Sequence, residues 1–228
     1  MSAYSDRVIA DGASAYWRLN EPSGTTAFDL AGSAHGTISG AVTLGQPGAL
    51  ADGDKAMRVN GTITEKITTP AVTLPIICSV EAWIQSSAVA LKAYLSTRPG
   101  SGTIIGKQAT HEVFVYVSGF VVSTGLVGDG AWHHVVVTVS VATTRIYLDG
   151  VLDTTVAQAH PAETQPLTLG GDGNDVNLTW NGGLDEIAIY PRALTAQEIA
   201  DHYALRLVPD SAGGGRPISL GAWKQGLS

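Results

Sequence analysis

Residues 130–153, GAWHHVVVTVSVATTRIYLDGVLD, carry the local signals that decide the fold. The run HHVVVTVS (133–140) has apolar residues at both odd and even positions, so both faces of a strand formed by it would be apolar. This predicts an inner strand covered on both faces. Further on, Asp149-Gly150 lies between two alternating segments, and this dipeptide favours the left-handed pair of conformations that a two-residue type I′ turn needs. We therefore expect an antiparallel hairpin whose first strand lies inside a sheet.

Similar strand signals recur along the rest of the chain. Runs rich in Val, Ile, Thr, Tyr and Trp alternate with clusters of Gly, Pro, Asp and Asn, which is typical of antiparallel β-sandwiches and barrels. A chain of 228 residues is long enough to bury a full core in one such domain. The clearest strands are expected at 14–19, 55–60, 78–85, 102–108, 112–119, 133–140, 144–150 and 185–190.

One helix is expected, near the C-terminus, in LTAQEIADHYAL (194–205). Thr195 and Glu198 have the spacing of a capping box, and Leu194 and Ile199 have that of a hydrophobic staple. Residues 1–206 then form the sandwich. Residues 207–228 have no periodicity and are rich in Gly and Pro, which predicts an extended tail. Its apolar residues favour docking on a partner, and the expected anchors are Ile218, Leu220 and Trp223.

Composition excludes several classes of protein. The chain is 44% hydrophobic and 14% charged, which argues against disorder. Its net charge of −7, without a basic stripe, argues against nucleic acid as a partner. No segment approaches about 18 continuous apolar residues, so membrane insertion is not expected. The N-terminus has no signal-peptide pattern, which predicts synthesis in a cytoplasm.

Four fragments, taken together, resemble a known family. They are AYWRLNEPSGTTAFDLAGSAHGT (15–37), CSVEAWI (78–84), the hairpin quoted above and GGLDEIAIYPRALTAQEIADHY (182–203). Their order and spacing resemble the laminin-G-like jelly rolls of the concanavalin A-like lectin and glucanase superfamily, over roughly residues 4–205. The resemblance implies an all-β, two-sheet antiparallel jelly-roll sandwich with one short C-terminal helix, whose first and last segments lie side by side.

The resemblance also implies one calcium ion, near the meeting point of the first loop and the last strand. Carried over to this chain, the ligands are Asp29 and Asp185, with backbone carbonyls around Gly32. The loop departs from the family pattern D-x-S-G-N-G-x-H-G, because it is one residue shorter and lacks the asparagine. The alternative is that Asp29 forms an Asx-turn and Asp185 accepts backbone N–H groups at the entry to the strand.

Catalysis is not expected, although some superfamily members hydrolyse glucans with an E-x-D-x-x-E strand. That pattern is missing here, and Glu81 has no second acid within six residues. Asp185 and Glu186 are adjacent on an expected strand, so they should point to opposite faces and could not flank one glycosidic bond.

A sugar site is expected instead at Trp180, flanked by Asn177 and Asn181 in a polar loop. An aromatic ring offers a platform to the apolar face of a sugar, while amides bind its hydroxyl groups. The alternative is that Trp180 closes one end of the core.

The resemblance extends to modules of tailed-bacteriophage virions. It implies a non-enzymatic structural or decoration protein on a capsid or tail surface, present in multiple copies, with the sandwich displayed for adhesion to a host surface or glycan. The tail would bind other virion proteins. A free carbohydrate-binding module is the first alternative, and a glucan hydrolase is the second.

Overall fold

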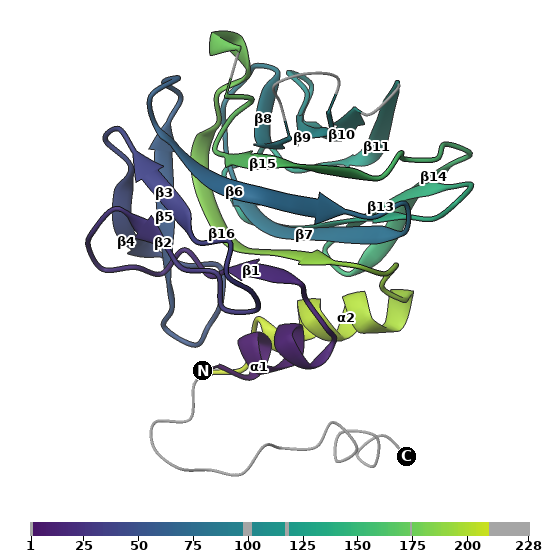
Figure 1. Cartoon of the computed structure of the whole chain (residues 1–228), viewed down its shortest axis with the longest axis horizontal. Coiled ribbons are helices and arrows are strands. Elements are labelled where there is room, and N and C mark those ends of the chain that lie inside the picture. Colours follow the sequence, from purple (N-terminus) through teal and green to yellow (C-terminus); the bar gives the residue numbers. More distant parts are fainter. Residues whose placement is uncertain (1, 98–101, 117–118, 174, 210–228) are drawn as a thin grey trace.

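Sixteen strands form two antiparallel sheets of eight in the computed structural model, which describes residues 2–97, 102–116, 119–173 and 175–209. The sheets face each other as a sandwich (Figure 1). We call them sheet A and sheet B. The expected all-β, two-sheet jelly-roll sandwich is confirmed.

In sheet A the strand order is β14-β13-β12-β7-β16-β5-β4, and β1 also pairs with β16. The bounds are β1 Ala15–Trp17, β4 Thr43–Pro47, β5 Lys55–Asn60, β7 Cys78–Gln85, β12 Trp132–Val139, β13 Thr144–Leu148, β14 Val151–Val156 and β16 Asn181–Tyr190.

In sheet B the strand order is β11-β10-β9-β8-β15-β6-β3-β2. The bounds are β2 Thr26–Ala27, β3 Gly36–Ser39, β6 Lys66–Leu74, β8 Lys92–Ser96, β9 Ile104–Lys107, β10 Glu112–Tyr116, β11 Phe120–Leu126 and β15 Glu163–Leu169; a 3₁₀ turn, η1, covers Val176–Leu178.

The hairpin between β13 and β14 forms as expected. Asp149 and Gly150 have φ angles of 50° and 82°, the paired left-handed conformation of a type I′ turn. Strand β12 lies inside sheet A between β13 and β7, and its residues from His134 to Val139 are buried. Both faces of this strand are covered, as its continuous apolar run predicts.

The first and last segments of the domain lie side by side, as the resemblance implied. Strand β1 pairs with the second half of β16, with Ala15 opposite Ile189 and Trp17 opposite Ile187. The first half of β16 pairs with β5 instead, with Leu184 opposite Met57. Strand β16 therefore changes neighbour halfway along its length, at the point where its register with β7 also shifts.

Two helices cover part of the outer face of sheet A and lie next to each other (Figure 1). Helix α2, Ala196–Leu205, begins at the expected capping box, in which both reciprocal hydrogen bonds between Thr195 and Glu198 are present. Helix α1, Ala3–Ala10, was not expected from the sequence. Its two buried apolar side chains, Tyr4 and Val8, pack in a cluster shared with α2, so the helix depends on tertiary contacts.

Within the described ranges, neither helix has the length or the apolar character needed to cross a lipid bilayer. The expected tail begins directly after α2, but residues 210–228 lie outside the described part of the chain. The expected anchors Ile218, Leu220 and Trp223 therefore lie outside it as well.

Candidate functional site

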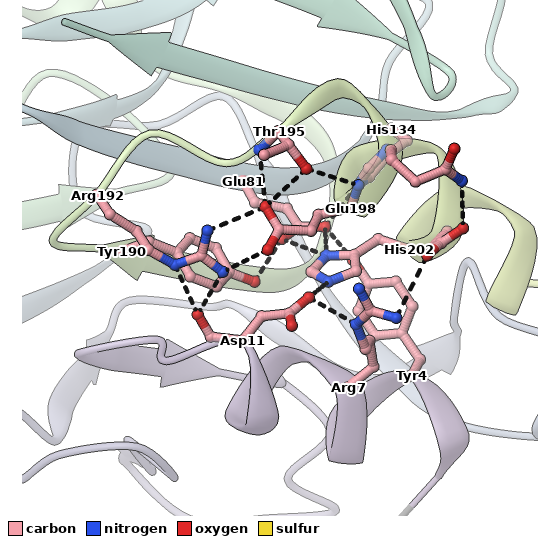
Figure 2. A network of polar contacts seen from close by, with 12 residues as sticks. Tyr4, Arg7, Asp11, Glu81, His134, Tyr190, Arg192, Thr195, Glu198 and His202 are labelled. Atoms are coloured by element: carbon pink, nitrogen blue, oxygen red, sulfur yellow. Dashed lines mark hydrogen bonds and ion pairs between the residues drawn. The ribbon is translucent and has the colours of Figure 1, made fainter. Parts of the chain in front are cut away.

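A buried carboxylate, Glu81 on β7, joins sheet A to both helices (Figure 2). Its Oε1 accepts hydrogen bonds from Tyr4 Oη at 2.8 Å and His134 Nε2 at 2.6 Å, and its Oε2 accepts one from Tyr190 Oη at 2.6 Å. His202 of α2 lies 3.0 Å from both oxygens through Nδ1. The carboxylate thus receives donors from β12, β16, α1 and α2.

The charges of this network stabilise each other. Burial alone would lower the pKa of His202, but Glu81 and Asp11 beside it raise that pKa to about 9. Burial would likewise raise the pKa of Glu81, and His202 and His134 instead hold it well below its usual value. His202 is therefore an imidazolium between two carboxylates, with Nε2 lying 2.8 Å from Asp11 Oδ2. The network holds the helices on the sheet.

Asp29 organises the first loop through backbone hydrogen bonds. Its Oδ1 accepts from the N–H groups of Tyr16, Ala31 and Gly32 at 2.9–3.0 Å, and its Oδ2 accepts from that of Ala34 at 2.9 Å. The bond to Ala31, two residues on, is an Asx-turn. These four donors match the alternative expected for Asp29 and leave its carboxylate little capacity to bind a cation.

Asp185 and Glu186 converge, and the expectation that they point to opposite faces is wrong. Glu186 has a φ of 50°, and the register of β16 with β7 shifts between Asp185 and Ala188. This bulge breaks the alternation of side chains along the strand. Oxygen atoms of Asp54, Asp185 and Glu186 consequently lie within 4.8 Å of one another.

Arg18 is the cation among these acids. Its Nε lies 3.1 Å from Glu186 Oε1, and one terminal nitrogen is ion-paired with Asp54 and lies 3.5 Å from Asp52 Oδ2. One guanidinium thus pairs with three carboxyl groups. Burial, reinforced by the neighbouring acids, raises the pKa values of Asp185 and Glu186 well above their usual range. The cluster contains more acidic groups than one arginine can pair with.

The two expected calcium ligands differ in how well they fit an ion. Asp29 does not fit, because backbone N–H groups occupy its carboxylate, and it is not part of the convergent group. Asp185 does fit: Ala49 N donates to its Oδ2 at 2.8 Å, whereas its Oδ1 is buried and has no hydrogen-bond partner among the residues that the structure describes. Together with Asp54 and Glu186 it offers oxygen atoms, which calcium prefers.

Trp180 is not a sugar platform, and that expectation is corrected. Its side chain is 0% exposed and lies in the core between the sheets. Its Nε1 donates to the carbonyl oxygen of Gly183 at 3.2 Å, and its ring meets Tyr94 edge-on. The alternative, in which Trp180 completes the core, is the one observed. Asn177 and Asn181 are exposed, so the three residues do not form one site.

A different tryptophan, Trp132, forms an aromatic surface on the outer face of sheet A. Strand pairing aligns Trp132 with Gln85, then Gly183, then Arg58, across β12, β7, β16 and β5. Directly paired residues share a face, so these side chains lie on one side of the sheet. Trp132 is partly exposed and lies over Gly183, where a β-carbon would fall 2.5 Å from its Cη2.

These residues line a pocket of about 140 Å³, which Gln46 and Pro47 of β4 complete. Asn181, two residues before Gly183 on β16, shares the same face by the alternation of side chains. An aromatic ring with amides around it is the arrangement that sugar binding requires. The sequence did not reveal this site, because five strands far apart in the chain contribute to it.

Comparisons with known proteins agree with the fold. A lectin-like β-sandwich is the class that the two sheets define. Residues 60–200 match the family model of the concanavalin A-like lectin/glucanases superfamily, and the chain belongs to that superfamily. A search of curated proteins finds no match.

Solved structures share the fold at low sequence identity. Domain 4 of AbnA, a GH43 extracellular arabinanase from Geobacillus stearothermophilus solved with arabinotriose, matches with a TM-score of 0.68 and 18% identity, covering 84% of this chain and 98% of that domain. The binding domain of paraclostridial mosquitocidal protein 1 matches with a TM-score of 0.67 and 14% identity, and the match covers 86% of this chain and 52% of that domain. The receptor-binding domain of botulinum neurotoxin type G matches with a TM-score of 0.67 and 13% identity, and the match covers 85% of this chain and 51% of that domain. The chain spans about half the length of these two toxin domains.

Proposed function

We propose that this chain is a non-enzymatic carbohydrate-binding domain whose sugar site is the Trp132 pocket on sheet A. The observation that carries the proposal is the row of Trp132, Gln85 and Arg58 on one open face of the sheet. The ring can stack on the apolar face of a sugar, while the amide and guanidinium groups bind its oxygens. The arabinanase domain of the same fold, solved with a trisaccharide, supports this reading.

The site predicts that Trp132→Ala weakens glycan binding at least tenfold without unfolding the domain, because the ring is partly exposed and its loss removes the stacking surface. A glycan array followed by calorimetry on the best ligand measures the effect. Phe120→Ala is the matched control, since Phe120 is an aromatic residue of sheet B that is 57% exposed.

Two results would contradict the proposal. One is a wild-type domain that binds no glycan, or a Trp132→Ala variant that keeps wild-type affinity. The other is release of reducing sugar from β-glucans by the wild-type domain, which would favour the glucan hydrolase instead.

We further propose that the sandwich is displayed on a virion, as a capsid or tail surface protein in multiple copies. The resemblance of the YWRLNE and YPRALTAQEI segments to phage virion modules supports this setting. The expected partners are other virion proteins, bound through the tail 207–228. Host-surface glycan would then be the ligand of the outward-facing domain.

Truncation after Pro209 tests the tail. We expect the shortened chain to fold and bind glycan as before, because the helix α2 and its capping contacts are retained, but to be lost from assembled particles. Co-purification of the chain with particles is the measurement. Replacing Ile218, Leu220 and Trp223 together with serine should have the same effect, and normal incorporation of either variant would refute the docking role.

We also propose that calcium binds at Asp54, Asp185 and Glu186, where it would supply positive charge to a group of carboxylates that Arg18 only partly neutralises. The buried Oδ1 of Asp185, which lacks a hydrogen-bond partner in the described part of the chain, supports the proposal. A pocket of about 220 Å³, lined in part by Arg18, Asp52 and Asp54, offers an approach from solvent.

Calcium at 100 times its dissociation constant should stabilise the domain by about 2.7 kcal/mol relative to chelator. The gain should be smaller at pH 5 than at pH 7.5, because the raised pKa values of Asp185 and Glu186 let protons compete with the ion. Thermal melts measure this. Asp54→Asn should abolish the gain and the surface substitution Asp129→Asn should keep it, whereas identical wild-type melts in calcium and chelator would exclude the ion.

A further inference from the structure

The charge of the Trp132 pocket indicates which kind of sugar it takes, an inference that rests on the proposed carbohydrate-binding function. Arg58 lies on β5, next to Gly183 of β16 in the pairing register, and lines the same pocket as Trp132. Its side chain is partly exposed. Arg58 therefore lies beside any molecule that stacks on the tryptophan ring within this pocket.

Arg58 has no partner for its charge within the described residues. No hydrogen bond or ion pair joins its guanidinium to another described group. Arg7, Arg18 and Arg192 are all ion-paired with acids, in a chain that carries 20 acidic and 13 basic residues. Arg58 is thus an arginine without a counter-charge among the described residues, and it is half-buried in the same pocket as an aromatic ring. Such a guanidinium can bind the anionic group of a ligand.

The rest of the pocket is suited to a sugar that carries this anion. The amide of Gln85, which lies between Trp132 and Gly183 in the register, also has no hydrogen-bond partner among the described residues. It can donate to one hydroxyl group and accept from another. At about 140 Å³ the pocket is smaller than the roughly 300–1,000 Å³ of typical ligand sites, so a single sugar residue is the appropriate size.

We propose that the pocket binds a carboxylate-bearing sugar residue, with its ring on Trp132, its hydroxyl groups on Gln85 and its carboxylate on Arg58. The planar guanidinium matches a carboxylate with two parallel, charge-assisted hydrogen bonds, and a neutral sugar lacks the negative charge that strengthens them. The carboxylate can come from a hexuronate or from a sialate, and the two share this chemistry at the arginine.

Calorimetry on the full chain tests the inference with matched ligands: oligogalacturonate against neutral galacto-oligosaccharide, and sialyllactose against lactose. We expect at least tenfold tighter binding of one acidic ligand than of its neutral match, and the acid that shows it identifies the source. Added salt should reduce this preference, because it screens the ion pair.

Variants separate the inference from the proposed function. Arg58→Gln should lower affinity for the acidic sugar at least tenfold and affinity for the neutral sugar much less, so that the preference for the acid is lost, whereas Trp132→Ala should weaken both. Arg145→Gln, a partly exposed arginine on β13 of the same sheet, is the control and should change neither.

Three outcomes overturn the acidic-sugar inference while the carbohydrate-binding function stands. They are equal Trp132-dependent affinity for acidic and neutral sugars, an acid preference that persists in Arg58→Gln, and competition by inorganic phosphate as strong as by the free uronate. Absence of any saccharide binding, or binding that survives Trp132→Ala, would instead overturn the proposed function itself.

Discussion

Replacement of Glu81 by glutamine should destabilise the domain by about 3–5 kcal/mol near pH 6, the cost of breaking a buried ion pair by removing one partner. Glutamine has nearly the same shape, but it carries no charge and presents an NH₂ group where the carboxylate accepted hydrogen bonds. The imidazolium of His202 would lose its main counter-charge, and the donors from Tyr4, Tyr190 and His134 would compete for one oxygen.

The pH dependence of this effect follows from the pKa values of the pair. The pKa of His202 is raised from 6.5 to about 9 in the folded state, so its stabilisation is complete below about pH 6.5 and is lost as the pH rises through 9. The pKa of Glu81 is lowered, so its contribution is present above its unfolded value of about 4.5 and is lost as the pH falls. The stabilisation by this pair should therefore be greatest between about pH 4.5 and 6.5.

Urea unfolding of both proteins at pH 6 and pH 9.5 measures the prediction. The deficit of Glu81→Gln should shrink at pH 9.5, where the wild type has itself lost the proton on His202. Glu198→Gln is a charge-matched control at a partly exposed cap of α2, and it should cost about 1 kcal/mol. A Glu81→Gln variant within 1 kcal/mol of wild type at pH 6 would show that the network does not hold the helices in place.

Trp180→Ala is expected to cost about 3–5 kcal/mol, as large-to-small substitutions of buried aromatic residues do. The indole is fully buried between the sheets, packs edge-on against Tyr94 and donates a hydrogen bond to Gly183. Removing it leaves a cavity that two hydrogen-bonded sheets cannot easily close.

Chemical denaturation of Trp180→Ala beside Trp132→Ala measures the contrast. The first variant should lose stability and should lose glycan binding only to the extent that it unfolds. The second should lose binding while staying folded. If Trp180→Ala is as stable as wild type but fails to bind glycan, Trp180 has no structural role in the core. That result would favour the original expectation that Trp180 contacts the sugar.

Local features of this fold could be predicted from the sequence because neighbouring residues determine them. The type I′ turn at Asp149-Gly150 and the capping box of Thr195 and Glu198 both form as expected. Helix α1 was missed for the opposite reason. Tyr4 and Val8 give a weak helical pattern, and the helix is stabilised by packing on sheet A and α2 and by the hydrogen bond of Tyr4 to Glu81.

Site residues were harder to predict because their positions depend on strands far apart in the chain. The bulge at Glu186 has a positive φ at a non-glycine residue, which nothing in the local sequence signals, yet it brings Asp185 and Glu186 together. Trp132 and Trp180 both belong to strand-rich, polar-flanked segments. Only the order of the strands places one on the surface and the other in the core.

By itself the sequence determined the strands, the turn, the helix cap and the resemblance to a superfamily, since these follow from residues close together in the chain. Tertiary structure decided which face of each strand is covered, which acids converge and which tryptophan is available to a ligand. The physical reason is that alternation along a strand fixes which side chains share a face. What covers that face depends on long-range pairing between β4, β5, β16, β7 and β12 and on the two helices that cover part of it.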